Sequence, residues 1–276
     1  MEIPKRKISA SIVLYNTNLK QLNDVINSFS PSENRILYII DNSIKKTNTE
    51  KIKYLNNIQY YFTGANKGYG AGHNIAIKMA IDNDSQYHVV LNTDLIFEPN
   101  IINKIVNFMD SDLSIGQVMP KILSPNGDLQ YLCKLLPTPA DLLLKRFLPK
   151  KYKEKYMKKF QLKFTSYNNI MNVPYLSGCF MFFRVSCLKS IGIFDERFFM
   201  YPEDIDITRR MHKLFKTLYY PEVSIIHIHA SESYKKIKLF LIHVNNIIKY
   251  FNKWGWFFDK ERNKINKETL LRLKRV

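Results

Sequence analysis

Cysteines, acidic residues and long apolar runs are all scarce in this sequence. Its three cysteines, Cys133, Cys179 and Cys187, do not have a metal-binding spacing, and one disulfide would leave the third unpaired, so we expect reduced thiols. No uncharged apolar run reaches the ~18 residues of a membrane-spanning helix. The N-terminal residues lack the apolar core and cleavage site of a signal peptide. These absences predict a cytoplasmic protein without a disulfide framework.

The shortage of acidic residues leaves a positive charge that is unevenly distributed. There are 42 Lys and Arg against 24 Asp and Glu, a net charge of +18. Residues 134–163 contain ten basic and two acidic residues, and residues 235–276 contain twelve and three, so the two stretches account for 17 of the 18 charges. A nearly neutral body with two basic stretches is typical of a protein held on an anionic surface.

Apolar side chains lie among the charges of both stretches, as they do in segments that bind a bilayer interface. In the first stretch Leu142, Leu143, Leu144, Phe147 and Leu148 accompany Arg146, Lys150 and Lys151, and in the second Trp254, Trp256, Phe257 and Phe258 accompany Lys253 and Lys260. We therefore expect contact with an anionic membrane, at the inner face of the cell membrane. The alternative is that both stretches pack on the domain and expose a solvated basic face.

Short apolar runs alternate with helical patterns in the first half of the chain, and apolar residues make up 46% of the sequence, enough for a core. Strands are expected at 8–14, 35–40, 58–62 and 87–91, and helices at 18–28, 68–83 and from Pro99 onward. This alternation predicts an α/β fold with a mostly parallel central sheet flanked by helices. Residues 120–172 break the pattern, 173–183 are again apolar, 217–227 contain one or two short strands, and 235–253 have helical apolar spacing.

Two aspartates follow strands that should be parallel. Asp41 ends the run at 35–40, and Asp94 closes Asn92-Thr93-Asp94 after the run at 87–91. Ligands of such sheets bind beyond the carboxyl ends of the strands, so we expect both carboxylates in one crevice. A carboxylate there can hold Mg²⁺ or Mn²⁺, which prefer oxygen ligands and bridge phosphates. Taken alone, each aspartate is equally typical of a turn.

A glycine-rich segment, Asn66-Lys67-Gly68-Tyr69-Gly70-Ala71-Gly72, precedes the helix expected at 68–83. Glycines let a ligand approach the backbone and leave amides free to point at it, and a helix N-terminus favours phosphate. The segment lacks the Gly-Lys-Ser/Thr ending of a P-loop. It is compatible with phosphate binding and also with a simple tight turn.

Five acids and several aromatic residues alternate between Phe194 and Asp206. A carboxylate in a partly buried aromatic setting has a raised pKa and suits a general base, whereas a helix start alone would explain Glu203 and Asp204. Further along, His227 and His229 point to one face of an expected strand, where His227 is the better candidate for a metal ligand. A lone strand histidine is more often structural.

These segments, in this order, resemble the family 2 glycosyltransferases of GT-A fold, and among them the bacterial rhamnosyltransferase-like enzymes of surface polysaccharide assembly. The likeness covers about residues 8–258. It rests on SIVLYN, IIDNS, NKGYGAGHN, LNTDLIFEP, YLSGCFMFFR, FDERFFMYPEDIDITRR and HIHASES, followed by KYFNKWGWFFD. The resemblance implies a GT-A (Rossmann-like) catalytic domain over 1–232, with 120–172 as a basic insertion on the acceptor or membrane side, and a basic amphipathic helical extension at 233–276.

On the donor side the resemblance implies that Asp41 hydrogen-bonds the nucleotide base and that Asn66 and Gly68 line the nucleotide pocket. Asp94 matches the last acid of the family's Asp-x-Asp metal motif. Asn92 replaces the first acid, as it does in the rhamnosyltransferase-like subgroup. Because asparagine offers a neutral oxygen, we expect weaker binding of Mg²⁺ or Mn²⁺.

On the reaction side, Asp204 matches the catalytic base, with Glu203 beside it on the acceptor. His227 matches a histidine that helps hold the metal or the diphosphate. The implied reaction is inverting transfer of a sugar from dTDP-rhamnose or a UDP-hexose to a hydroxyl of a lipid-linked saccharide. The resemblance implies no oligomeric state.

Three other classes of protein fit parts of the pattern. A sugar nucleotidyltransferase shares the strand-end carboxylates, but it needs a glycine-rich basic loop after the first strand, where this chain has Tyr15-Asn16-Thr17. A dinucleotide oxidoreductase needs G-x-G-x-x-G at the same point. A nucleic-acid-binding protein would also be basic, but the basic stretches match none of its motifs, so no nucleic-acid partner is expected.

Overall fold

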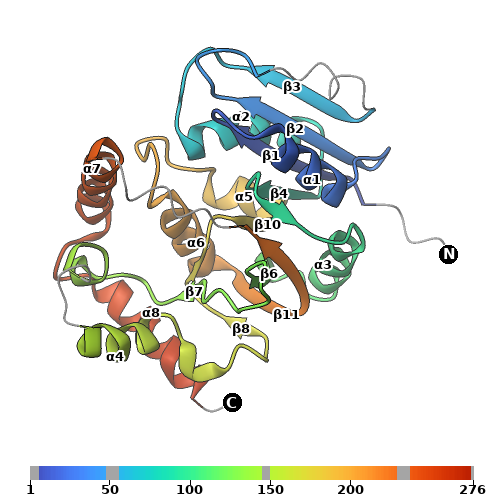
Figure 1. Cartoon of the computed structure of the whole chain (residues 1–276). Helices are drawn as coiled ribbons and strands as arrows, with labels where there is room; N and C mark the ends of the chain where they lie inside the picture. The colour runs from blue at the N-terminus through green and yellow to red at the C-terminus, as the bar shows by residue number, and fades with distance from the viewer. Residues whose placement is uncertain (1–5, 48–55, 145–149, 229–236, 275–276) are drawn as a thin grey trace.

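The computed structural model describes residues 6–47, 56–144, 150–228 and 237–274 (Figure 1). Its first half consists of β1 (Ile8–Leu14), α1 (Leu19–Phe29), β2 (Arg35–Asp41), β3 (Ile58–Phe62), α2 (Tyr69–Asp82), β4 (Tyr87–Leu91), β5 (Leu95–Ile96), α3 (Asn100–Asp110) and β6 (Ile115–Leu123). Its second half contains β7 (Cys133–Lys134), a π-helical turn (Ala140–Leu144), α4 (Lys150–Phe160), a 3-10 turn (Lys163–Thr165), β8 (Met171–Asn172), β9 (Tyr175–Leu176), β10 (Phe180–Arg184), α5 (Val185–Ile191), α6 (Glu203–Leu214), β11 (Lys216–His227), α7 (Ile237–Trp254) and α8 (Lys260–Leu273). The strands and helices predicted for the first half are confirmed.

A nine-stranded sheet runs through the molecule in the order β3-β2-β1-β4-β10-β6-β11-β5, with β8 paired to β11. Strands β3, β2, β1 and β4 are parallel, as are β6 and β11, whereas β10 runs antiparallel between β4 and β6. The predicted α/β fold with a mostly parallel sheet is confirmed. The segment 217–227 forms a single strand, β11, whose register shifts between Tyr220 and Ser224 around Pro221.

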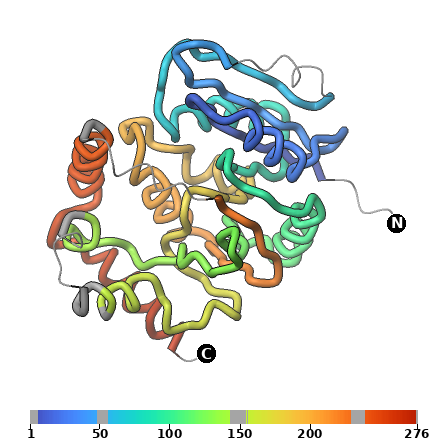
Figure 2. Tube along the Cα trace, in the orientation of Figure 1, coloured from blue at the N-terminus to red at the C-terminus, as the bar shows by residue number. Residues whose placement is uncertain are grey.

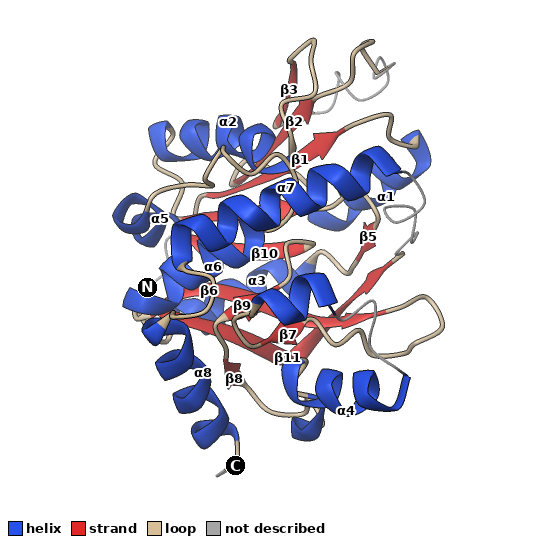
Figure 3. Ribbon diagram, turned by 90° about the vertical axis from the view of Figure 1, so that its left-hand side faces the viewer, coloured by secondary structure: helices blue, strands red, loops and turns tan. Residues whose placement is uncertain are grey.

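Side-chain alternation along β1 separates the two faces of the sheet. Ile8, Ala10 and Ile12 belong to the largest apolar cluster, which also contains the buried residues of α1 and α3. Ser9 and Ser11 point to the other face, where α2 packs and Ser11 Oγ lies 2.7 Å from His73 Nδ1. Helices α2, α5 and α6 cover this second face together (Figure 3).

The C-terminal helices pack against α6, β9 and the segment that follows β7. Helix α7 contributes to an apolar cluster of Leu136, Tyr175, Phe198, Ile205, Ile247, Tyr250 and Phe251. On α8, Asn266 donates to the carbonyl of Leu136 and accepts from its amide, at 2.9 and 2.8 Å. The C-terminal chain therefore lies beside the segment that follows β7 (Figure 2). The predicted domain boundary at 232/233 lies outside the described residues.

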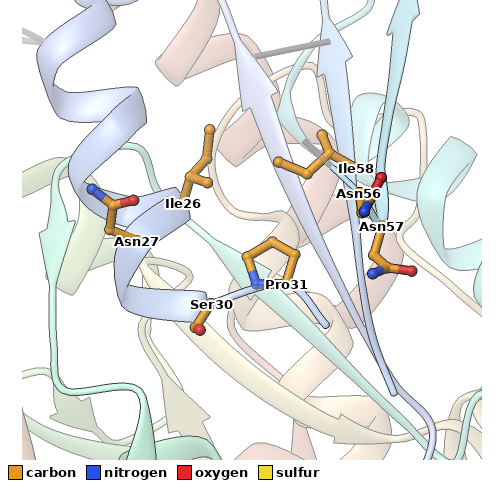
Figure 4. A pocket seen from close by; sticks show the side chains of 7 residues that line it. All are labelled: Ile26, Asn27, Ser30, Pro31, Asn56, Asn57 and Ile58. Carbon is orange, nitrogen blue, oxygen red and sulfur yellow. The ribbon is translucent and has the colours of Figure 1, made fainter. Parts of the chain in front are cut away.

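None of the described helices is both long and apolar enough to cross a membrane. A surface hollow of about 320 Å³ lies between the C-terminal end of α1 and the start of β3, lined by Ile26, Asn27, Ser30, Pro31, Asn56, Asn57 and Ile58 (Figure 4). Because it lies at the amino ends of the parallel strands, it is at the opposite edge from Asp41 and Asp94.

Candidate active site

Segments far apart in the sequence meet at the carboxyl edge of the parallel strands. Asp41 is the last residue of β2, and Asn92 directly follows β4. Strand β10 begins beside the end of β4, because Phe180 pairs with Leu91. This pairing brings Cys179 next to Asn92, whose amide donates to the Cys179 carbonyl at 3.0 Å. Asp41 and Asn92 therefore lie at the same edge of the sheet, and a single crevice shared by Asp41 and Asp94 stays a prediction.

Asp204 lies in the first turn of α6 and is fixed by the loop before β10. Its Oδ2 accepts from the Gly178 amide at 3.0 Å, and its Oδ1 accepts from the Ile205 amide at 2.8 Å. Burial raises the pKa of Asp204, and the positive charge of Lys134, the two amides and the Tyr175 hydroxyl only partly offset this increase. A held carboxylate with a raised pKa has the properties of a general base.

Glu203, the neighbouring acid, is buried rather than open to an acceptor. Burial, followed by the charge of Asp204, raises the pKa of Glu203 to about 8. Its Oε2 has no hydrogen-bond partner among the described residues. The two carboxyls therefore oppose each other's ionisation, and Asp204 is the one whose oxygens accept hydrogen bonds from two backbone amides.

Asp94 and His227 face each other across the ends of β5 and β11, with Nε2 of His227 3.3 Å from Oδ1 of Asp94. Gln130 orients the imidazole. Its Nε2 donates to the His227 carbonyl at 2.9 Å, so its Oε1, 3.0 Å from Nδ1, accepts the Nδ1 proton. Nε2 is then the ring nitrogen that faces Asp94, and a metal-binding histidine usually has its other ring N–H donated to an oxygen in this way.

These two side chains fit a divalent cation. Oδ1 of Asp94 is buried without a hydrogen-bond partner among the described residues, and Nε2 of His227 lies 3.3 Å from it, so a cation bound beside the two would stabilise the carboxylate. Within the described ranges no cluster of three or more His, Cys, Asp or Glu side chains could hold a metal. A cation here would take its other ligands from a diphosphate or water. His229, the other candidate ligand, lies outside the described residues.

The glycine-rich segment packs against protein rather than forming an open cradle. The amide of Gly68 donates to Asn66 Oδ1 at 3.0 Å, and the amide of Tyr69 donates to the Phe199 carbonyl at 2.9 Å. A Cβ on Gly68 would lie 2.2 Å from that carbonyl oxygen, and one on Gly72 would lie 2.8 Å from Val13. The interpretation that leaves these amides free for phosphate is therefore wrong for Gly68 and Tyr69.

Asp41 is fully buried, and its oxygens accept hydrogen bonds within the protein. Oδ1 accepts from the Ser43 amide at 3.0 Å, and Oδ2 accepts from the Thr47 amide at 2.8 Å and the Tyr60 hydroxyl at 2.5 Å. Burial acts to raise the pKa of Asp41, but these hydrogen bonds outweigh it and lower the pKa. Contact between Asp41 and a nucleotide base requires that the cover formed by Thr47 and Tyr60 be displaced.

The other acids of the cluster between Phe194 and Asp206 have structural partners. Asp206 is fully buried and accepts from the Trp254 indole at 2.8 Å and from Arg210 at 2.9 Å. Lys253 bridges Asp206 and Asp195, at 2.5 and 2.8 Å. These ion pairs fasten α7 to α6. Acids of this one segment therefore serve two purposes: Asp204 belongs to the candidate site, whereas Asp195 and Asp206 form structural ion pairs. Only the tertiary structure distinguishes the two groups.

Residues of the two basic stretches differ in their surroundings: some pack on the domain and others are exposed to solvent. Lys134, counted with the first stretch, lies over the Tyr175 ring near Asp204. The Arg209 guanidinium lies 4.0 Å from the centre of the Trp254 ring and Lys253 pairs with Asp206, so both side chains pack on the domain, as the alternative interpretation predicts. Phe257 and Phe258 are 74% and 97% exposed. Residues 145–149, which include Arg146, Phe147 and Leu148, lie outside the described residues.

Sequence reasoning missed four side chains of the site: Tyr69, Gln130, Lys134 and Tyr175. The hydroxyl of Tyr69 lies 3.0 Å from the side-chain amide of Asn92 and 2.7 Å from the Gly178 carbonyl. None of the four belongs to an acidic or histidine motif. Tyr69 and Tyr175 do lie in two segments that carry the resemblance, NKGYGAGHN and YLSGCFMFFR, but a segment match does not indicate where a hydroxyl points.

Solved structures show which class this fold defines. GalNAc-T7, solved with UDP, GalNAc and Mn²⁺, superimposes with a TM-score of 0.66 at 15% identity, over 90% of this chain and 48% of that one. S. aureus TarS (residues 1–349) superimposes with a TM-score of 0.57 at 16% identity, over 96% of this chain and 70% of that one. The fold is that of the GT-A glycosyltransferases.

Residues 23–243 match the family model described as "Glycosyltransferase like family 2", and the chain belongs to this family. The N-acetylglucosaminyl-diphospho-decaprenol L-rhamnosyltransferase of Mycobacterium tuberculosis is 26% identical over 62% of this chain and 59% of its own length. Rhamnosyltransferase WbbL of Escherichia coli is 25% identical over 69% of this chain and 72% of its own length. The chain thus spans about three fifths of the mycobacterial relative. Its resemblance to rhamnosyltransferase-like enzymes is confirmed at low identity.

Proposed function

We propose that the protein is an inverting glycosyltransferase that moves a sugar from a nucleotide diphosphate, dTDP-rhamnose or a UDP-hexose, to a hydroxyl of a lipid-linked saccharide. The observation that carries the proposal is the convergence of the Asp94–His227 pair and Asp204 at one edge of the sheet, joined through Tyr69 and Gly178. The names of the rhamnosyltransferase relatives support this donor and acceptor class. Family membership disfavours the nucleotidyltransferase and nucleic-acid-binding alternatives.

In this mechanism Asp204 accepts the proton of the acceptor hydroxyl, and the oxygen of that hydroxyl attacks the anomeric carbon of the donor sugar. The new C–O bond forms as the bond from that carbon to the diphosphate breaks, and the nucleoside diphosphate leaves with the electron pair. The Gly178 amide and the Ile205 amide hold the Asp204 carboxylate in place. Mg²⁺ or Mn²⁺ held by Asp94 and His227 would supply positive charge to the leaving diphosphate. Positioning and charge stabilisation supply most of the rate acceleration.

The experiment separates donor binding from turnover. A thermal-shift panel of nucleotide diphosphates and their sugars, with and without Mn²⁺, should give one ligand that stabilises the protein only with metal. Asp94→Asn should abolish that shift. Asp204→Asn should retain it and lower turnover by ~10²-fold or more. Asp128→Asn, in an exposed turn, is the control and should change neither. Wild-type turnover in Asp204→Asn would exclude Asp204 as the base.

We also propose that the protein works as a peripheral enzyme on the inner face of the cell membrane. The exposed aromatic pair Phe257 and Phe258 lies between α7 and α8, next to the exposed Lys260, and Leu241 on α7 is 61% exposed. Aromatic and basic side chains together suit an anionic bilayer interface. Cosedimentation with vesicles containing phosphatidylglycerol should weaken with salt.

The matched control for this surface is Leu113, an apolar side chain that is 76% exposed in the turn between α3 and β6. The double substitution Phe257→Ser and Phe258→Ser should reduce binding to the vesicles, whereas Leu113→Ser should not. Absence of wild-type binding at low salt, or equal binding by the Phe257→Ser/Phe258→Ser protein, would exclude this surface.

A further inference from the structure

The hydroxyl of Tyr69 makes two contacts with only one proton. It lies 2.7 Å from the carbonyl oxygen of Gly178 and 3.0 Å from the side-chain amide of Asn92. A backbone carbonyl can only accept, and no other donor to the Gly178 carbonyl occurs in the described part of the chain. The Tyr69 proton therefore belongs to Gly178.

This assignment determines which way the Asn92 amide faces. With its proton committed, the Tyr69 oxygen has only lone pairs left for Asn92, so the Asn92 atom that faces it must be the NH₂ group. The nitrogen and oxygen of a side-chain amide have nearly the same size and shape, so their hydrogen-bond partners decide which is which. The amide oxygen of Asn92 then points the other way, away from Tyr69.

Tyr69 is also unable to change this pattern by losing its proton. Burial, followed by the charges of Glu203, Cys179, Asp204 and Asp94, raises the pKa of Tyr69 well above its usual value. Asp94 on the donor side and Asp204 on the acceptor side both act on Tyr69, so the ring lies between these two parts of the site. An aspartate at position 92 would place an oxygen with no proton against the Tyr69 oxygen.

We propose that Tyr69 is a positioning residue that specifies asparagine at position 92 and holds the Asn92 amide with its nitrogen facing the Tyr69 oxygen and its own oxygen turned away. Asn92 then replaces the first aspartate of Asp-x-Asp because the Tyr69 hydroxyl needs a donor there, and the replacement is not simply the loss of a metal ligand. The inference deepens the proposed function, because it rests on the roles given to Asp94 and Asp204.

The same hydroxyl connects the donor side to the base. Gly178 accepts from Tyr69 through its carbonyl and donates to Asp204 Oδ2 through its amide at 3.0 Å. A Cβ on Gly178 would lie 3.1 Å from the Asp204 Cβ, so the residue has little room to move. Loss of the Tyr69 hydroxyl should therefore loosen both the Asn92 amide and the Asp204 carboxylate.

The test is a double-mutant cycle with Asn92→Asp and Tyr69→Phe in the full chain. Asn92→Asp restores the family's acid, yet kcat/KM should fall ~10- to 100-fold, because a polar group is left against an unpaired partner. The Mn²⁺ concentration for half-maximal activity should not fall. In the Tyr69→Phe background the same Asn92→Asp change should cost at least about fivefold less.

A matched control is present at the far end of α2, where Asn83 Nδ2 donates to the Tyr38 hydroxyl at 2.7 Å. Asn83→Asp makes the same chemical change at a tyrosine outside the site. It should lower stability but leave kcat and the Mn²⁺ requirement at wild-type values. Asn92→Ser, which is neutral and can still donate, should retain more activity than Asn92→Asp and serves if Asn92→Asp folds poorly.

Urea unfolding of the same four proteins of the cycle gives a second coupling that requires no sugar transfer. Equal losses from Asn92→Asp in both backgrounds, or an Asn92→Asp protein with tighter Mn²⁺ binding and undiminished turnover, would overturn the inference. A wild-type protein that transfers no sugar but shows the coupling in unfolding would instead overturn the proposed function. The two failures are therefore distinguishable.

Discussion

Replacing Gly68 with alanine should damage the protein more than its size suggests, because the added methyl group meets backbone. The new Cβ would lie 2.2 Å from the Phe199 carbonyl oxygen and 2.9 Å from its carbon. Gly68 also has φ +90°, where a side chain is strained by about 1–3 kcal/mol. Moving the Phe199 carbonyl away breaks its hydrogen bond from the Tyr69 amide, which costs a further ~1–3 kcal/mol. We expect a total loss of about 4 kcal/mol in unfolding free energy.

The control is Gly127→Ala, since Gly127 has φ +86° but a Cβ added there would meet nothing within 4 Å. Only the backbone strain remains there, so the loss should be about 1–2 kcal/mol. Urea unfolding followed by fluorescence of Trp254 and Trp256 measures both values. Because Phe199 precedes the acids of α6, Gly68→Ala should also lower turnover, whereas Gly127→Ala should not. Equal destabilisation by the two changes would refute the steric argument.

Three further changes test the electrostatics. Lys134→Met removes a charge that lowers the pKa of Asp204, so the acid limb of the kcat/KM profile should move to higher pH. Burial lowers the pKa of His88 to about 3, so His88 should contribute a loss of stability of up to ~1.4 kcal/mol per pH unit below ~6.5. His88→Gln should reduce the slope in urea unfolding by that amount, while the buried His73 and His212 keep their share. Asp259→Ala leaves the buried Arg209 without its closest partner at 2.7 Å, and thermal or urea unfolding should show a loss of about 3–5 kcal/mol.

Each of these changes has an outcome that would contradict it. Lys163→Met, which removes a lysine that lies over Tyr131, should leave the pH profile in place, and an equal shift in both lysine variants would remove the specific role of Lys134. For His88→Gln, the quantity to compare is the slope of unfolding free energy against pH between pH 4 and 6.5, where one histidine contributes up to ~1.4 kcal/mol per unit. If this slope equals that of the wild type, groups other than His88 cause the acid sensitivity. A fully stable Asp259→Ala protein would show that Glu261 alone suffices for Arg209.

The sequence was sufficient for the elements with strong local patterns. The strands that end at Asp41 and Leu91 are short apolar runs, and a buried parallel strand needs no other signal. Parallel strands separated by helices must place their carboxyl ends at one edge, so the location of Asp41 and Asn92 at one edge followed from connectivity alone. The ordered motifs predicted the family, and the match over residues 23–243 confirmed it.

The local sequence pattern could not predict the role of a side chain that is equally common in a functional site and in a structural contact. Asp204 and Asp206 lie two residues apart in one acidic helix start, yet one is held by the Gly178 amide at the site and the other is buried beneath Trp254. Composition also placed Lys134 and Trp254 in surface stretches, because charge counts contain no information about packing partners.

The sequence by itself determined the α/β class, the parallel half of the sheet and the family, since all three follow from periodicity and the order of motifs along the chain. Tertiary structure alone decided that β10 inserts antiparallel next to β4 and so brings Gly178 to Asn92. It alone decided that Tyr69 reaches both. The physical reason is that hydrogen bonds between residues about a hundred positions apart depend on strand order and side-chain direction, which neighbouring residues do not specify.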